Sequence, residues 1–178
     1  MAEPLKLVLL GSTASEVKEL LEAQAQHFQN ASLQEGRVTG CSVFRFSSQI
    51  DLGEKGSPSF SLYGASMESG YRGIYALLMH NADGVMGLIP ADLARVKEGQ
   101  SVLVSLLQGL EERRAESNEL PLLLQYQWTA SAISPAPEEL DQALGVNPSA
   151  VSCIFTRAGA PEQTSGIEAL LTKILATD

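Results

Sequence analysis

The residues of this chain that could do chemistry first appear near its N-terminus, where a glycine separates an apolar run from a helix-like pattern. The apolar run Leu5–Leu10 ends at Gly11, and a polar stretch follows it. A strand, a glycine and a helix start together present backbone N–H groups to a phosphate. The residues of this candidate loop are Gly11, Ser12, Thr13, Ser15, Glu16, Val17 and Lys18.

The phosphate-binding chemistry of this loop is incomplete. The nucleotide-binding pattern requires a glycine, four residues and then Gly-Lys-Ser/Thr. The last three positions are Glu16, Val17 and Lys18, so the second glycine, the phosphate-facing lysine and the magnesium-binding hydroxyl are all missing. Glu16 would also direct a negative charge towards a polyphosphate. The sequence therefore predicts the scaffold of a nucleotide site without its activity, while Gly11–Thr13 could still form an anion-binding nest.

Other candidate chemistries have less support. The segment Gly64–Ser66 resembles the centre of a nucleophile elbow, but Glu68 replaces its second glycine and no histidine follows His80. We therefore interpret Ser66 as a helix N-cap. His27 and His80 have no His or Cys neighbour at metal-ligand spacing, so no metal site is predicted. A receiver domain is excluded as well, because no acidic pair follows the first strand.

Composition restricts the class of partner. The 178 residues are 44% hydrophobic, which suits one globular domain, and 21 acidic against 12 basic residues give a net charge of −9. This charge disfavours nucleic acid and anionic membranes. Cys41 and Cys153 are predicted to be reduced thiols. With no signal-peptide pattern and no apolar run near the ~20 residues of a membrane span, we expect a cytoplasmic protein without membrane insertion.

Strand-like and helix-like segments alternate along the chain, which favours a mostly parallel sheet with helices on both faces. We expect strands at 5–10, 42–50, 59–63, 84–89, 120–126 and 151–155, and helices at 14–29, 67–80, 92–114, from 135, and at 167–175. The turn-rich linker 51–58 predicts an antiparallel hairpin of the second and third strands. The predicted fold class is α/β, a single domain with a mostly parallel six-stranded sheet and one antiparallel edge pair.

Five segments, in this order and spacing, carry a resemblance to a known family. They are Phe44–Phe46, Ile50–Glu54, Ser61–Tyr63, Ala82–Val85 and Leu120–Tyr126. The chain thus resembles the MglA-type small Ras-like GTPases of gliding bacteria, from Leu5 to Leu175. The resemblance implies a Ras-like P-loop-NTPase-type domain. It also implies a family whose members cycle between GTP and GDP, set front-rear polarity for motility and act with a roadblock-fold partner.

The departures from this family fall on its nucleotide-handling motifs. After Tyr126 the family pattern implies Asn-Lys-x-Asp, whose carboxylate binds guanine, whereas this chain has Gln127, Trp128, Thr129 and Ala130. Where the family has a motif ending in Pro-Gly that meets the γ-phosphate, Gly64, Ala65, Ser66 and Met67 stand instead. Trp128 could stack on a base, but we interpret it as packing against the helix from Pro135. Phosphoryl transfer depends on the missing lysine and magnesium ligand, so no hydrolysis is expected.

The sequence therefore predicts a catalytically inactive pseudo-GTPase that needs no cofactor and acts through protein contacts. The resemblance implies a roadblock-type regulator, an MglA-type GTPase or a polarity scaffold as partner, with recruitment to a cell pole or motility complex. The alternative hypothesis is an atypical nucleotide-binding protein that uses Gly11–Ser15 and Trp128 with weak or no hydrolysis. We expect the protein contacts to lie on the surface that corresponds to the switch regions of this family. This surface includes Phe44, Phe46, Ile50, Leu52, Tyr63, Tyr71 and Arg72.

Overall fold

The computed structural model describes residues 3–28, 31–69, 73–114, 120–128, 134–147 and 149–176. The strands are β1 (Leu5–Gly11), β2 (Gln34–Val38), β3 (Cys41–Gln49), β4 (Ser59–Ser66), β5 (Gly84–Pro90), β6 (Leu122–Trp128) and β7 (Ser152–Arg157). The α-helices are α1 (Ala14–His27), α2 (Gly73–Met79), α3 (Val96–Arg114), α4 (Pro137–Leu144) and α5 (Ser165–Ile174). Short 3₁₀ turns cover Gly53–Lys55, Met67–Ser69, Leu93–Arg95 and Pro161–Thr164.

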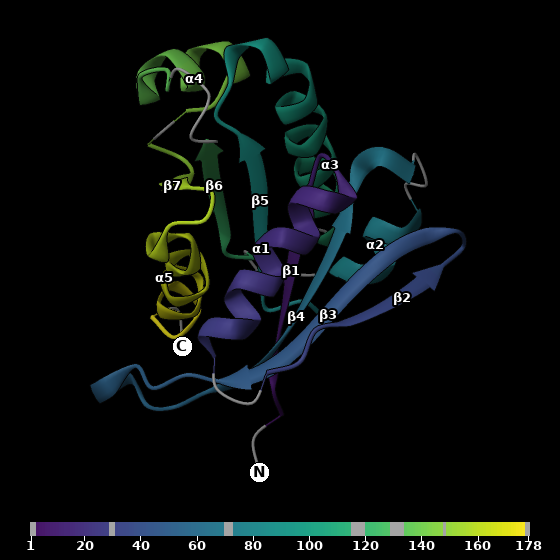
Figure 1. Cartoon of the computed structure of the whole chain (residues 1–178), viewed down its shortest axis with the longest axis vertical. Coiled ribbons are helices and arrows are strands. Elements are labelled where there is room, and N and C mark those ends of the chain that lie inside the picture. Colours follow the sequence, from purple (N-terminus) through teal and green to yellow (C-terminus); the bar gives the residue numbers. More distant parts are fainter. Residues whose placement is uncertain are drawn as a thin grey trace.

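The strands form one sheet of seven in the order β2-β3-β4-β1-β5-β6-β7 (Figure 1). Five strands from β4 to β7 run parallel, and β2 and β3 are antiparallel to their neighbours. The prediction of a mostly parallel α/β sheet is confirmed, and so is the β3–β4 hairpin. The prediction of six strands is wrong, because β2 adds a seventh. All five residues of β2 are exposed, so the strand lacks the apolar alternation by which a half-buried strand is recognised.

Helices cover both faces of the sheet, as predicted. On one face, α1 and α5 pack over buried side chains that include Leu7, Leu9, Phe60 and Leu62. On the other face, α2, α3 and α4 pack over a second cluster that includes Val8 and Leu124. Every strand except β2 contributes residues to both clusters, because successive side chains of a strand point to opposite faces. The central strand β5 is buried along its whole length, as expected of a parallel strand covered on both sides.

The predicted helix over 67–80 is divided. Met67–Ser69 forms a 3₁₀ turn and α2 begins at Gly73, with residues 70–72 outside the described part of the chain. The Tyr75 hydroxyl donates a buried hydrogen bond of 2.7 Å to the carbonyl of Ser66. Ser66 is the last residue of β4 rather than the predicted helix N-cap. This bond joins the end of β4 to the first turn of α2.

Candidate functional site

The candidate loop lies where the carboxyl ends of three parallel strands meet. Gly11 ends β1, and its strand neighbours are Ser66 at the end of β4 and Leu88 near the end of β5. Ligands of open α/β sheets bind in crevices at this edge. Thr13 is the N-cap of α1, and its hydroxyl accepts a hydrogen bond of 3.3 Å from the Glu16 backbone N–H. Sequence analysis therefore placed the loop correctly between a strand and a helix start.

The glycines of the loop region have a packing reason that does not involve a ligand. A Cβ on Gly11 would lie 2.6 Å from Cγ2 of Val17. A Cβ on Gly64, in the middle of β4, would lie 2.5 Å from Cδ1 of Leu21 and 2.8 Å from Cγ1 of Val17. Val17 and Leu21 are fully buried on α1. Gly11 and Gly64 therefore let α1 approach the sheet closely, so their presence is explained without a phosphate.

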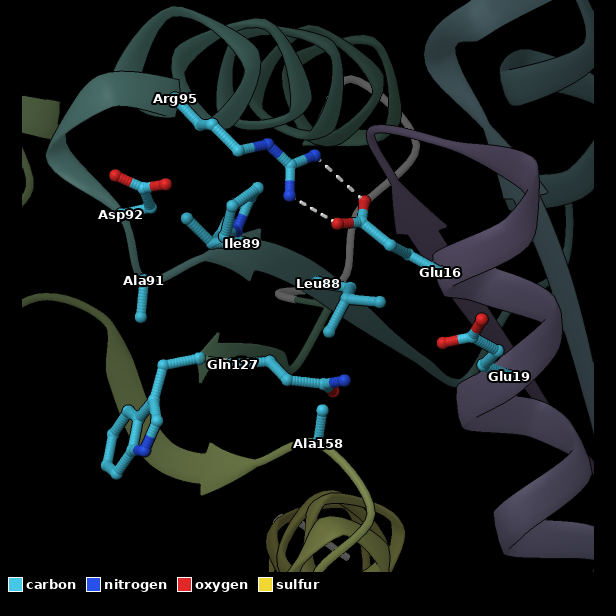
Figure 2. Close-up of a pocket in the computed structure, with 11 residues that line it drawn as sticks. Glu16, Glu19, Leu88, Ile89, Ala91, Asp92, Arg95, Gln127 and Ala158 are labelled. Atoms are coloured by element: carbon cyan, nitrogen blue, oxygen red, sulfur yellow. Dashed lines mark hydrogen bonds and ion pairs between the residues drawn. The ribbon is translucent and has the colours of Figure 1, made fainter. Parts of the chain in front are cut away.

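The Glu16 carboxylate is held by the chain's own donors. Two arise within the loop, since the Ser12 and Thr13 hydroxyls donate to Oε2 at 2.8 and 2.9 Å. Two come from Arg95, whose guanidinium binds both carboxylate oxygens, with 3.1 Å between Nη2 and Oε2 (Figure 2). Arg95 also donates to Ser12 Oγ at 3.2 Å and to the Glu98 carboxylate. Glu16 stands where the nucleotide-binding pattern has its second glycine, so an ion pair with Arg95 occupies this position.

The charges of this cluster adjust the pKa values of its members. Burial opposes ionisation of Glu16, but hydrogen bonds from Arg95, Ser12 and Thr13 prevail and lower the pKa of its carboxyl below the ordinary value. The hydrogen bond from Arg95 also lowers the pKa of Glu98. Hydrogen bonds to Glu98 and Glu16 raise the pKa of the Arg95 guanidinium. All three groups are therefore charged at neutral pH.

A second carboxylate occupies the start of α1. The backbone N–H of Ala14, the first residue of the helix, donates a hydrogen bond of 2.8 Å to Oε2 of Glu68. Glu68 lies in the 3₁₀ turn after β4. The first N–H groups of a helix have no partner within the helix, and they carry its positive dipole end. Glu68 thus binds where an anionic ligand would otherwise find a donor.

A narrow pocket lies between the N-terminal part of α1 and the ends of β5 and β6 (Figure 2). Its volume is about 70 Å³, and its lining includes Glu16, Glu19, Asp92, Arg95, Gln127 and Trp128. Within the described part of the chain, Oε1 of Gln127 is buried and has no hydrogen-bond partner. Pockets for drug-sized ligands occupy ~300–1,000 Å³. This pocket is therefore too small for a nucleotide in the observed conformation.

A wider open hollow of about 740 Å³ lies on the other side of the loop, between Glu68 and α3. Its lining includes the carboxylates of Glu68 and Glu98 and one cation, Lys97. Because acidic groups outnumber basic ones here, the hollow does not suit a polyphosphate.

The other predicted nucleotide-site residues lie as follows. Lys18 points away from the loop and forms an exposed ion pair of 3.1 Å with Glu35 on β2. The Ser15 hydroxyl lies 3.3 Å from that of Thr13. Met67 packs against the core cluster beneath α2 and α3. Trp128 belongs to the same cluster, with its ring centroid 6.2 Å from that of Phe155. Ala130 lies outside the described residues.

Three of the seven predicted protein-contact residues are buried and need correction. Phe44, Phe46 and Ile50 are buried, with 2, 1 and 8% of their surface exposed, because they fill the core beneath α1. They cannot contact a partner in this conformation. Tyr63 and Leu52 remain half-buried, and the Tyr63 ring lies between the cations of Lys6 and Arg45 at 5.5 and 5.2 Å. Tyr71 and Arg72 fall outside the described part of the chain.

Sequence reasoning missed Arg95 and Glu68, the two residues that complete the loop. Both lie just beyond the ends of strands that neighbour β1. The carboxyl ends of adjacent parallel strands share one edge of a sheet, so residues that follow β4 and β5 must approach the loop after β1. The spacing of Arg95 and Glu98 also places them on one helix face. Together these two signals could have identified the cluster.

Comparison with known proteins adds no family assignment. No model of a known protein family matches the chain, and no curated protein matches it. Among the described residues, no group of three or more His, Cys, Asp or Glu is arranged to hold a metal ion. Nor does that part of the chain contain a helix with the length and apolarity needed to cross a membrane.

Proposed function

We propose that this protein is a catalytically inactive pseudo-GTPase: a Ras-like domain that acts as an interaction or regulatory subunit through protein contacts. The observation that carries the proposal is the occupation of the phosphate-facing end of α1 by the chain's own carboxylates. Glu68 accepts from the Ala14 N–H, and Glu16 binds Arg95 and the loop hydroxyls. A Ras-like domain is compatible with the sheet of parallel strands and the strand-loop-helix start.

The residues present do not fit a nucleoside triphosphate. A triphosphate at this loop would meet the carboxylates of Glu16, Glu68 and Glu98, and the Arg95 guanidinium is already bound to Glu16 and Glu98. Catalytic phosphate sites do the opposite, and surround the developing charge with a lysine, a metal ion and backbone donors. Binding would require the chain to break its own ion pairs. This cost supports a role that does not depend on nucleotide.

Exposed apolar side chains support a role in protein contacts. Leu77 on α2 and Val104 and Leu107 on α3 are 60, 50 and 46% exposed. Val104 and Leu107 line one hollow, and contiguous exposed apolar patches mark interaction sites. An open hollow of about 350 Å³ beside Val104 and Leu107, between α3 and the end of α4, extends this apolar surface. We propose this surface of α2 and α3 in place of the buried residues Phe44, Phe46 and Ile50.

The test is a calorimetric and thermal-shift titration with GTP, GDP and ATP analogues, with and without magnesium. A ligand at 100 times its dissociation constant stabilises a fold by ~2.7 kcal/mol, which a melting curve detects readily. We expect no shift. A magnesium-dependent shift with GTP would overturn the proposal and favour the alternative, an atypical nucleotide-binding protein that uses the loop and Trp128.

The partner is tested with purified proteins. The resemblance stated above suggests a roadblock-fold regulator, an MglA-type GTPase and a polarity scaffold as candidates, each taken from the source organism. We expect one of them to bind, and Leu77→Ser with Leu107→Ser to weaken this binding while the melting temperature stays within a few degrees. The matched control is Leu93→Ser, an exposed leucine (48%) outside the proposed surface. Failure of all three candidates to bind would contradict the partner proposal.

A further inference from the structure

The outer edge of the sheet at β2 has the features of a pairing surface. β2 is the terminal strand of the sheet and pairs with β3 (Figure 1). Its five residues are Gln34, Glu35, Gly36, Arg37 and Val38, and all are exposed. An edge strand presents backbone N–H and C=O groups that can pair with another strand.

The hairpin turn determines which backbone groups of β2 face outward. Val38 and Cys41 are paired across the two-residue turn of Thr39 and Gly40, which have φ values of 50° and 84°. Two positive φ values define a type I′ turn, in which the Val38 carbonyl accepts from the Cys41 N–H. Hydrogen-bonded and non-hydrogen-bonded pairs then alternate along an antiparallel ladder. Gln34, Gly36 and Val38 therefore bond inward to β3, and the backbone groups of Glu35 and Arg37 face outward.

The residues with outward groups also carry opposite charges. Glu35 and Arg37 are two positions apart and point to the same face of the sheet. We propose that β2 pairs antiparallel with β2 of a second copy of this chain, with Gly36 opposite Gly36 of the partner subunit. Glu35 then lies opposite Arg37 of the partner subunit, and Arg37 lies opposite the partner's Glu35. Each of these pairs exchanges two backbone hydrogen bonds, and the two sheets become one continuous sheet.

Charge selects this register over its neighbours. A twofold axis through Glu35 would place two carboxylates opposite each other, and an axis through Arg37 would oppose two guanidinium groups. Opposite charges directly across a ladder stabilise the pairing, and like charges destabilise it. A register centred on Gly36 is the one in which both charges meet their complements and the whole strand overlaps. This complementarity favours a second copy over an unrelated extended peptide.

The inference is independent of the proposed function, because β2 pairs in this way whether or not the loop after β1 binds nucleotide. The interface is limited to a short strand, so it is smaller than that of a stable complex. We expect a weak, reversible dimer that becomes visible as protein concentration rises into the millimolar range. The charged pairs are exposed, so added salt weakens the dimer.

Charge exchange tests the pairing by sedimentation velocity over a concentration series. Glu35→Arg places arginines opposite arginines and Arg37→Glu places glutamates opposite glutamates, so each variant alone should be at least roughly tenfold weaker as a dimer. An equimolar mixture of the two variants should restore a dimer, as should the double exchange in one chain. Lys18→Gln, which removes the internal partner of Glu35, is the control that retains dimerisation.

A cross-link tests the register. Gly36 opposite its own copy is a non-hydrogen-bonded pair, whose Cα atoms lie ~4.5 Å apart, within the range of a disulfide. A Cβ on Gly36 meets nothing within 4 Å, so Gly36→Cys leaves the fold intact. In a Cys41→Ala background, which removes a nearby native thiol, it should form a disulfide-linked dimer far faster than the exposed control Glu54→Cys. A monomer at all concentrations, an unaffected dimer in the charge variants, or equal cross-linking of the two cysteines would each overturn the proposal.

Discussion

The start of α1 and the outer edge of β2 both present backbone groups that have no hydrogen-bond partner within their own element. The two regions differ in where partners for these groups come from. At α1, residues in the turns that follow β4 and β5 supply partners: Glu68 accepts from the backbone N–H of Ala14, and Arg95 binds the side chain of Glu16. At β2, no described strand of the chain pairs with the outward groups of Glu35 and Arg37. The chain itself thus binds the groups of the loop that resembles a ligand site, whereas β2, which carries no site motif, is the strand for which we propose a partner.

This difference shows why a sequence motif that resembles a phosphate site does not by itself indicate that the site binds phosphate. A helix N-terminus attracts anions of any origin, and a carboxylate fixed in the same fold competes at a high effective concentration with a free phosphate. A sheet edge can be satisfied in the same way only if the chain supplies another strand. We therefore expect changes at the start of α1, whose groups are bound within the chain, to affect stability more than changes at the exposed edge of β2.

The largest effect is expected where α1 meets the sheet. Gly64→Ala introduces a Cβ at 2.5 Å from Leu21 Cδ1, so the buried side chains of Leu21 and Val17, or α1 itself, must shift, and the free energy of unfolding should fall by about 1–3 kcal/mol. Gly36→Ala on β2 is the matched control, since its Cβ meets nothing within 4 Å; its effect should stay within about 0.5 kcal/mol. Denaturant unfolding of both variants measures the contrast. Equal losses would mean that α1 does not approach the sheet this closely.

The Arg95–Glu16 ion pair at the start of α1 and the Lys18–Glu35 ion pair at β2 should also contribute differently to the free energy of unfolding. Arg95 and Glu16 are 29 and 28% exposed, and Arg95→Met leaves the Glu16 carboxylate without its cation, so we expect a loss of about 1–2 kcal/mol. The Lys18–Glu35 pair is 43 and 47% exposed, and Lys18→Met should cost about 0–0.5 kcal/mol because water screens this pair. Urea unfolding at low ionic strength compares the two variants. A larger loss for Lys18→Met would contradict the interpretation that the ion pair at the start of α1 contributes more to stability than the ion pair at β2.

The pH dependence of stability follows from the same pair. The folded-state pKa values of Glu16 and Glu98 lie below their ordinary values, so the stabilisation is present above the unfolded pKa and is lost as pH falls through the folded pKa. Arg95→Met removes a principal cause of this lowering, so the pKa of Glu16 should be less depressed in the variant than in the unmodified protein. We therefore expect the free energy of unfolding to fall less between pH 6 and pH 3, taken as a window of about 1.5 units around the ordinary carboxyl pKa, in the variant than in the unmodified protein. Parallel curves for the two proteins would contradict this linkage.

The sequence predicted the fold class because strong patterns specify the buried elements. β1 and β5 are short, almost continuous apolar runs and the apolar residues of α5 recur at the helical period, so these elements were located to within about two residues. β2 was missed for a physical reason. Its side chains face solvent on both sides, so nothing in its polarity distinguishes it from a loop, and the β-branched Thr39 in a turn that requires positive φ hides the hairpin signal.

The sequence predicted only part of the candidate site, because local patterns indicate some of its residues and not others. Local spacing indicates Gly11, Thr13 and Glu16 as a strand-loop-helix start, and the structure places them so. The partners that close the loop come from residues 54 and 79 positions away, Glu68 and Arg95. Such pairings depend on the sheet order, which the local pattern does not contain. Buried aromatic residues such as Phe44 were placed on a surface because the resemblance indicates a motif but not the direction of its side chains.

The smallest effect concerns Glu68, which holds the start of α1 from an exposed position. Glu68→Ala should lower the free energy of unfolding by about 0.3–1 kcal/mol, because it removes a charge-assisted acceptor from the positive end of the helix dipole. It also frees the Ala14 N–H, so phosphate ion should then stabilise the variant more than the unmodified protein in a thermal-shift titration. Glu54→Ala, in the 3₁₀ turn between β3 and β4, is the control that keeps Glu68 in place. If phosphate stabilises all three proteins equally, the carboxylate of Glu68 does not compete for the helix terminus. A gain confined to Glu68→Ala would instead mean that one side chain separates this loop from an anion site.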